Sequence, residues 1–424
     1  MLINKKELLD ALAIANRVVE KKSSMAILSC VRIDGKSCTM QATDLDVGVT
    51  IPLEISQSDE LFTLSARRIT DIVRSLDADD VEILALESTE ETPRENWVGI
   101  NGLFEISGYD ADEFPQFEIP ETTGYATIGK TPLQNILPAV CKDADSGFKL
   151  NGVYFDADQG KSVATDGHRL HLEPIEVDGG SFMMPIKALR NILSSLGKDE
   201  DEITFGTVVQ KIVEKEGSGE PPEKTLLTGL NRPQLCSLAE DYFDITFDDE
   251  VKVPTIKKTL MDKMVEASKI VYRESVKNAV VKTEAATFVV RTLETRFPDY
   301  ASIVPENPAH VITVKRGEFL AAVEQSLTMA NERYKAVKLT FNGKGTIEMQ
   351  SVNPDIGNYQ RLTVPMSGHV DPAVEAGYNP AYLRDIMNVT KDNDAEFEVG
   401  VNSESLPLTF KLESFEGLVM PMRV

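Results

Sequence analysis

Apolar side chains recur every three or four residues in six segments of the chain, which is the spacing of an amphipathic helix with one buried face. The six segments pair up, and the two members of each pair begin about 55 to 65 residues apart. Stretches rich in Val, Ile, Thr and Phe lie between them and are typical of short strands. The pattern therefore predicts three similar domains with two helices each, at 4–19, 65–76, 131–142, 185–196, 316–331 and 379–390.

Two segments rich in turn-forming residues separate the predicted domains. They read DEFPQFEIPETTG at 112–124 and FPDYASIVPENPAH at 297–310, and each carries a Phe-Pro step and a further proline. The middle domain is lengthened by a stretch at about 198–275, with a candidate helix at 254–271, which we interpret as an insertion. The predicted domains are 1–122, 123–306 and 307–424.

The net charge at first argues against a nucleic acid partner. The chain has 44 Lys and Arg against 68 Asp and Glu, a formal charge of −24, whereas a DNA-binding surface normally needs basic residues to neutralise phosphates. Five of the six predicted helices, however, are neutral to basic, and the one at 185–196 contains Lys187 and Arg190 and no acid. The helix at 316–331 has one Arg and two Glu, but Lys315, Arg333 and Lys335 flank it. Either the helices gather positive charge on one surface, or they are ordinary solvated faces. Charge alone leaves both interpretations open.

Several classes of protein lack support in the sequence. The cysteines form no CxxC pair and no Cys/His cluster, which disfavours a zinc site or a disulfide framework. No apolar run approaches the roughly 18 residues that span a bilayer, and the N-terminal segment is amphipathic, unlike a secretory signal. Phosphate-cradling GxxxxGK[ST], GxSxG and HExxH motifs are also missing. We therefore expect a cytoplasmic protein that needs no cofactor or metal.

One long segment resembles a known family. LNGVYFDADQGKSVATDGHRLHLEPI, at 150–175, is similar to the middle domain of the bacterial DNA polymerase III beta subunit, the sliding clamp. The similarity touches all three predicted domains, and only the insertion has no counterpart. Further similar stretches follow the family's order: TDLDVGV at 43–49, ADEFP at 111–115, RFPDYASIVP at 296–305, NERYKAVKL at 331–339, GYNPAYLRDIM at 377–387 and LVMPMRV at 418–424.

The resemblance implies an α+β fold of three topologically similar clamp domains, each with two helices backed by antiparallel sheets. A head-to-tail homodimer of such chains closes a ring around double-stranded DNA, with the helices lining the hole and the acidic excess outside. The ring is a non-catalytic processivity factor that tethers DNA polymerase and other clients. Its loading uses a separate clamp loader, to which any use of ATP would belong.

The resemblance also implies a hydrophobic cleft between the middle and last domains that accepts a client peptide. Plain core packing is the alternative for each apolar member, and Asp166 with His168 could instead suggest an acid–base or metal site. Relatives often carry Arg where this chain has Ser302, and Phe where it has Tyr334, which leaves the preferred peptide motif open. The cleft residues so assigned are Leu150, Thr165, Gly167, His168, Arg169, Leu170, Pro298, Ile303, Tyr334, Asn379, Tyr382, Val419, Met420, Pro421, Met422 and Arg423.

DNA contacts and the ring interface are assigned from the same resemblance. Phe104 and Ile106 would meet the region of Thr328 and Met329 in the second copy, and strand alternation puts the first two on one face, as an interface or a core requires. Two rival hypotheses stay open: a hydrolase built around Asp166 and His168, and an acidic scaffold that never encircles DNA. The implied DNA-binding residues are Lys21, Lys22, Arg67, Phe148, Lys149, Lys187 and Arg190.

Overall fold

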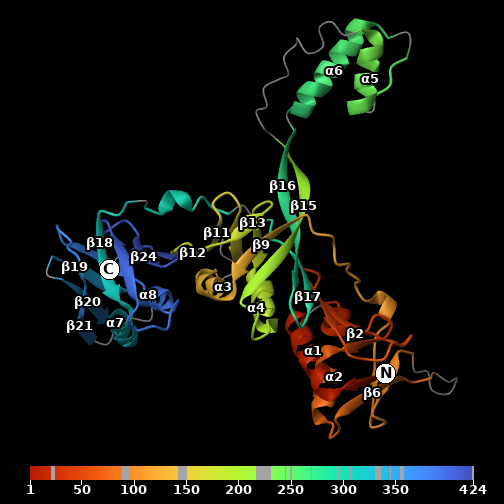
Figure 1. Cartoon of the computed structure of the whole chain (residues 1–424), viewed down its shortest axis with the longest axis horizontal. Helices are drawn as coiled ribbons and strands as arrows, with labels where there is room; N and C mark the ends of the chain where they lie inside the picture. Colours follow the sequence, from red (N-terminus) through yellow and green to blue (C-terminus); the bar gives the residue numbers. More distant parts are fainter. Residues whose placement is uncertain are drawn as a thin grey trace. The chain divides into compact units, whose positions relative to one another are not determined.

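The computed structural model describes most of the chain, as two compact units (Figure 1). The larger unit is Met1–Val208 with Val276–Val424, and the smaller one is Val209–Ser275. All structural statements concern the described residues, which are 1–20, 24–87, 95–141, 150–215, 231–243, 245–248, 251–268, 270–294, 297–305, 307–329, 336–343, 345–353 and 358–422.

All six helices that the hydrophobic pattern predicts are present in the larger unit. Local sequence fixes their ends: the Asn4 side chain accepts hydrogen bonds from the backbone N–H groups of Lys6 and Glu7 and so caps the first helix. The helices are α1 (Lys5–Val18), α2 (Ala66–Ser75), α3 (Lys130–Ile136), α4 (Ile186–Ser195), α7 (Arg316–Met329) and α8 (Pro380–Met387).

The third helix is shorter than its predicted range of 131–142. α3 ends at Ile136, and one 3-10 turn, η3 (Leu137–Ala139), follows it. Pro138 has no N–H to donate and its ring clashes with the preceding turn, so a proline here ends the α-helix. Pro138 therefore accounts for the early end of the predicted helix. Other 3-10 turns are η1 (Ala26–Ser29), η2 (Ala111–Glu113) and η5 (Ala301–Ile303).

The strands form four sheets, and two of these join neighbouring predicted domains. The two end sheets are β1 (Leu2–Asn4), β6 (Asp80–Ala85), β7 (Trp97–Ile100) and β8 (Phe104–Ser107), and β21 (Asn358–Pro365), β20 (Thr346–Asn353), β19 (Val337–Phe341) and β22 (Val374–Tyr378). The nine-stranded sheet runs β13 (Glu176–Asp178), β9 (Gly124–Gly129), β15 (Glu202–Lys215), β16 (Ile270–Lys282), β17 (Thr287–Arg291), β4 (Val47–Pro52), β3 (Thr39–Thr43), β2 (Cys30–Asp34) and β5 (Leu61–Ser65). The eight-stranded sheet runs β14 (Phe182–Pro185), β10 (Gly152–Asp156), β11 (Lys161–Thr165), β12 (Arg169–Pro174), β25 (Phe415–Val419), β24 (Leu408–Leu412), β23 (Glu396–Val401) and β18 (His310–Lys315).

Two antiparallel ladders make these joins. We call the β4–β17 ladder, with the contacts across it, the first junction, and the β12–β25 ladder, with the contacts across it, the second junction. Val47 pairs with Val290 in the first, and Arg169 pairs with Val419 in the second. The sheets are therefore continuous across both junctions, and backbone hydrogen bonds hold each pair of predicted domains together.

The same turn precedes both ladders. Asp44 Oδ1 accepts hydrogen bonds from the N–H groups two and three residues on, and Asp166 Oδ1 does the same. The residue after each aspartate has a positive φ, 78° at Leu45 and 84° at Gly167. Thr43 and Thr165 each accept from that residue's N–H as well. Thr-Asp is therefore a repeated device that starts the strand of each junction.

The smaller unit contains two helices, α5 (Arg232–Phe243) and α6 (Val253–Ser268), which lie side by side (Figure 1). Leu235 and Ala239 of α5 pack with Ile256 and Leu260 of α6 in a small core. The sequence predicted α6 within a few residues at 254–271, but it did not predict α5. Hydrophobic periodicity in α5 is weak because Pro233, Ser237 and acidic residues interrupt it.

Candidate functional site

The second junction buries a charged side chain. Arg169, the first residue of β12, is 4% exposed, and its guanidinium group contacts three separate elements. Nε donates to Asp166 Oδ2 at 3.0 Å, and Nη1 donates to Asp385 Oδ2 of α8 at 2.6 Å. Nη2 donates to the carbonyl oxygen of Pro138 in η3. A buried guanidinium is tolerated only when it is paired in this way, so Arg169 is a fixed part of the junction.

Arg169 also touches the aromatic wall of the predicted cleft. Its guanidinium carbon lies 4.3 Å from the centre of the Tyr382 ring, which is a cation–π distance. Tyr382 lies in the first turn of α8, which the Asn379 side chain caps by accepting from the Ala381 N–H. The negative charge of Asp166 and burial both raise the pKa of Tyr382, with burial the larger cause, so this residue stays a neutral phenol.

Further along β12, two more polar side chains are buried. His171 is fully buried, its Nδ1 lies 2.8 Å from the Asn135 carbonyl, and its ring meets Phe415 edge-on. Burial lowers the pKa of His171 to about 4, so the ring is neutral at physiological pH and Nδ1 is the donor. Glu173 accepts from the side chains of Asn135 and Ser414, and burial raises its pKa. These contacts connect α3 and β12 to the last predicted domain.

The linker at 297–305 lies against the same sheet. Tyr300 is 7% exposed and donates to Asp156 Oδ2 at 2.8 Å, while Phe297 stacks on Tyr154 with ring centres 4.7 Å apart. Burial raises the pKa of Tyr300 above its usual range, which keeps the hydroxyl a donor. These anchors hold Pro298 and Ile303, both exposed, at the surface of the linker. An apolar cluster of Val163, Leu170, Leu172, Tyr300 and Leu418, with Tyr154, Phe297, Val304 and Met420 at its margin, lies beneath them.

The C-terminal segment adds a further wall. Val419 is fully buried, Met420 N donates to the His168 carbonyl at 2.9 Å, and Met422 N donates to the Gly377 carbonyl at 2.8 Å. Met422 remains 37% exposed. The segment is thus pinned by its backbone on both sides, with one apolar side chain left open to solvent.

The structure brings most of the predicted cleft residues to the second junction, although their roles differ. His168, Pro298, Ile303 and Met422 are exposed, and Tyr382, Met420 and Pro421 are half-buried, so these side chains are available to a ligand. Tyr334 and Arg423 lie outside the described residues. The buried members, which support the surface from below, are Leu150, Thr165, Arg169, Leu170 and Val419.

Sequence reasoning missed the residues that hold these side chains in place. Asp385 and Asp156 are acids in unremarkable contexts, and their partners lie 216 and 144 residues away in the chain. One signal was available, since the Thr-Asp pair of the turn occurs at both 43–44 and 165–166. The repeat would have singled out Asp166 as a turn residue and weakened the hypothesis that it serves in acid–base chemistry.

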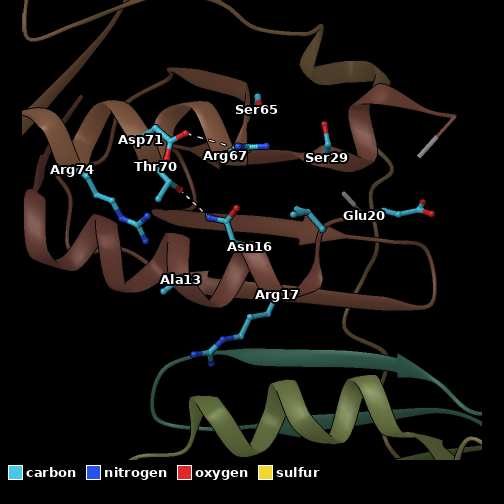
Figure 2. A pocket seen from close by; sticks show the side chains of 11 residues that line it. Ala13, Asn16, Arg17, Glu20, Ser29, Ser65, Arg67, Thr70, Asp71 and Arg74 are labelled. Atoms are coloured by element: carbon cyan, nitrogen blue, oxygen red, sulfur yellow. Dashed lines mark hydrogen bonds and ion pairs between the residues drawn. The ribbon is translucent and has the colours of Figure 1, made fainter. Parts of the chain in front are cut away.

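A second candidate surface lies on the neighbouring helices α1 and α2 (Figure 2). A pocket there is lined by Arg17, Arg67 and Arg74, with Glu20 and Asp71 as the acids. Asn16 joins the two helices by donating to Leu12 O and Thr70 Oγ1, each at 2.8 Å. Arg67 is almost fully exposed and lies 3.9 Å from Asp71, a pairing that contributes little in water. Arg67 and Arg74, both exposed, are therefore the arginines available to a phosphate group, whereas Arg17 donates to the carbonyl and hydroxyl oxygens of Ser194.

The residues predicted to bind DNA differ in exposure and in their contacts. Arg67 and Arg190 are exposed on α2 and α4. Lys187 instead forms an ion pair with Asp44 and donates to the Val18 carbonyl, so its charge is already partly neutralised across the first junction. Lys21, Lys22, Phe148 and Lys149 lie outside the described residues.

The predicted interface residues lie at the edge of an end sheet. Phe104 pairs with Ile100 and Ile106 with Val98, so both half-buried side chains share the face of two buried neighbours. β8 is an edge strand of its sheet. Thr328 is exposed in the last turn of α7, and Met329 ends that helix. Core extension and interface therefore both remain compatible with this edge.

Among the described residues, no group of three or more His, Cys, Asp or Glu side chains is placed to hold a metal ion. The four cysteines are free thiols, and burial raises the pKa of Cys30 to about 11. No helix in the described ranges is both long and apolar enough to cross a bilayer.

Comparison with known proteins identifies a class. Two family models match, "DNA polymerase III beta subunit, N-terminal domain" over residues 1–118 and "DNA polymerase III beta subunit, C-terminal domain" over residues 301–423. The beta sliding clamp of Haemophilus influenzae is 24% identical over 439 residues, covering 100% of this chain and 99% of the relative. That of Pseudomonas aeruginosa is 21% identical, with the same coverage of both chains.

Solved structures agree on the fold. A Pseudomonas aeruginosa sliding clamp with ligand matches with a TM-score of 0.72 at 19% identity, covering 100% of this chain and 99% of that one. The Bacillus subtilis clamp matches with a TM-score of 0.72 at 19% identity, covering 100% and 98%. The chain belongs to the DNA polymerase III beta subunit family, whose members are non-catalytic processivity factors.

Proposed function

We propose that this chain is a DNA sliding clamp: two copies close a ring around duplex DNA and tether DNA polymerase to it. Membership of the beta subunit family is the observation that carries the proposal. The proposed ring works in the cytoplasm and is opened and placed on DNA by a clamp loader. The rival scaffold hypothesis requires no ring, so oligomeric state and topology separate the two.

The repetition of the sheets supports a head-to-tail dimer. At each junction, the strand after the Thr-Asp turn pairs with the last strand of the following predicted domain, β4 with β17 and β12 with β25. The corresponding strand of the last domain is β21, and the last strand of the first domain is β8; both are edge strands. If the same strand pairing is repeated between copies, β21 of one copy pairs with β8 of the next. Phe104 and Ile106 of β8 would then lie in the interface. Two such contacts close a dimer.

The helices also repeat one pattern of contacts: the first helix of one predicted domain lies near the second helix of the next. α1 contacts α4 across the first junction. Residues of α3, η3 and α8 line one pocket at the second. The repeat would set α7 of one copy against α2 of the next, with Thr328 and Met329 nearby. Six helices per copy would then line the hole, where Arg67, Arg74 and Arg190 contact phosphates without reading sequence.

The cleft at the second junction supports client binding. Ile303 and Met422 are exposed on the linker and on the C-terminal segment, and both segments pack on the same buried apolar cluster; a pliable methionine accommodates different apolar anchors. A Pseudomonas aeruginosa sliding clamp has been solved bound to griselimycin. That clamp is 20% identical to this chain and matches it with a TM-score of 0.72. We propose the surface at the second junction of this chain as the docking site for the polymerase and other clients.

The test is retention on DNA after loading by the matching clamp loader. The protein should remain on nicked circular plasmid and slide off the same plasmid once it is linearised, and light scattering should give twice the chain mass. A monomer, or equal loss from both plasmids, would favour the scaffold hypothesis. Arg67→Glu with Arg74→Glu should reduce retention on circles, whereas the same reversal at exposed Lys411 of β24 should not.

A further inference from the structure

We propose that Arg169 is a positioning residue of the client cleft, held in place by Asp385, and that it does not itself contact the client. The inference rests on the proposed clamp function. It differs from the expectation that Arg169 is a direct member of the peptide-binding surface. Asp385, which the sequence did not single out, becomes a determinant of client affinity.

The first step of the argument is accessibility. Arg169 exposes only 4% of its surface, and each of its three guanidinium nitrogens donates to an oxygen of the protein itself. The ring of Tyr382 lies 4.3 Å from the guanidinium carbon. A client at the surface therefore meets Tyr382 rather than the charge behind it.

The second step is connectivity. The three acceptors belong to the β11–β12 turn, to η3 after α3, and to α8, so one planar group sets the mutual position of three elements. Asp166 also fixes the backbone of His168, and α8 carries Tyr382 and begins at the Asn379 cap. Both walls of the cleft thus depend on the same guanidinium.

The third step is the particular role of Asp385. It is the one of the three acceptors that belongs to α8, and it is partly exposed while Arg169 is not. Without it, the guanidinium loses its hydrogen bond to α8, and the Tyr382 ring can move relative to the β11–β12 turn. A preformed cleft binds more tightly because less freedom is lost on association.

The experiment is a double-mutant cycle on the full-length dimer, with griselimycin binding measured by calorimetry. Arg169→Ala and Asp385→Ala should each weaken the Kd by roughly tenfold or more, and the double variant should be little weaker than either alone. Asp385→Asn keeps the shape and one acceptor oxygen, so its loss should be intermediate. The control is Asp44→Ala, which breaks the Asp44–Lys187 ion pair and the Thr-Asp turn of the first junction and should leave the Kd within twofold.

A measurement without any ligand accompanies the cycle. Hydrogen exchange should speed up in the first turn of α8 and at Met420 and Met422 in Asp385→Ala, with the first junction unchanged. Thermal unfolding and mass confirm that each variant is folded and dimeric, and if Asp385→Ala does not fold, Asp385→Asn carries the test.

The outcomes separate the two proposals. If Arg169 contacted the ligand directly, Asp385→Ala would leave binding unchanged or strengthen it, the two losses would add, and α8 exchange would stay as in the original protein; that result overturns the positioning role. Failure of the original protein to bind griselimycin would count against the cleft itself, and the exchange data would still decide whether Asp385 positions α8.

Discussion

The two junctions share one backbone arrangement, but they bury side chains of different kinds. Each begins with the Thr-Asp turn and continues as an antiparallel ladder. Alternate residues of β4 are Val47, Val49 and Ile51, whereas the corresponding residues of β12 are Arg169, His171 and Glu173. All six are at most 4% exposed. The face that β4 buries in the first junction is therefore apolar, whereas the face that β12 buries in the second carries a polar network.

The difference between apolar and polar contacts bears on how the elements that carry a client-binding site are held in place. Apolar packing holds two elements together but tolerates small shifts among them. A buried guanidinium with fixed acceptors costs desolvation, and in return it permits one arrangement. The cleft residues lie at the second junction, where orientation matters most. We infer that the polar network specifies geometry, while the apolar junction supplies cohesion.

The largest expected effect comes from making the second junction resemble the first. Arg169→Val introduces the residue found at the corresponding position of β4, but it leaves the carboxylates of Asp166 and Asp385 without their partner. Loss of one member of a buried ion pair costs about 3–5 kcal/mol. Native-state hydrogen exchange should show β12 and β25 opening more easily by that amount, with β4 and β17 unchanged. Equal changes at both ladders would refute the comparison.

Acid should weaken the second junction through His171. Its pKa is about 4 in the folded protein against an ordinary 6.5, so only the unfolded chain takes up a proton between these values, and stability falls as pH falls from 6.5 to 4. The full difference is about 3 kcal/mol. His171→Gln cannot titrate, so its unfolding free energy should decline less across this window. Glu173, whose pKa is raised, acts in the opposite sense in both proteins. His168→Gln, at an exposed histidine, is the control.

Tyr300→Phe should have a smaller effect, confined to the linker. It removes the donor to Asp156 while keeping the ring, which leaves a buried carboxylate oxygen unpaired and costs about 1–3 kcal/mol. Hydrogen exchange should increase at the Ile303 and Val304 amides, which donate to Tyr300 and Ala301. Phe297→Leu, at the neighbouring stacked ring, tests whether packing alone anchors the linker.

Lys187→Ala should have the smallest effect. This ion pair also crosses a junction, but the lysine side chain is 48% exposed, and such pairs contribute about 0–1 kcal/mol. Thermal unfolding should shift by a few degrees at most. A loss comparable to that of Arg169→Val would show that the first junction also depends on buried charge.

Local features were predictable from sequence, and contacts across the junctions were not. The Asn4 cap and Pro138 act within a few residues, so the pattern located α1 and the short α3. The α+β fold followed from the paired helices and from the family resemblance. Asp385 and Arg169 are 216 residues apart, and their meeting depends on the β12–β25 ladder, which no local pattern encodes. The burial of Arg169 was not predictable either, since the family resemblance assigned this arginine to the ligand-contacting surface.

The α5–α6 unit leaves and rejoins the nine-stranded sheet through the adjacent strands β15 and β16. Adjacent strands are about 4.8 Å apart, so whatever lies between them needs ends that almost touch. The entropic cost of closing the chain between β15 and β16 therefore depends little on the size of the segment inserted there. A dye-binding tag or another small domain with neighbouring termini could replace the two helices, and each copy of the chain would then carry one label at a known position in the sequence.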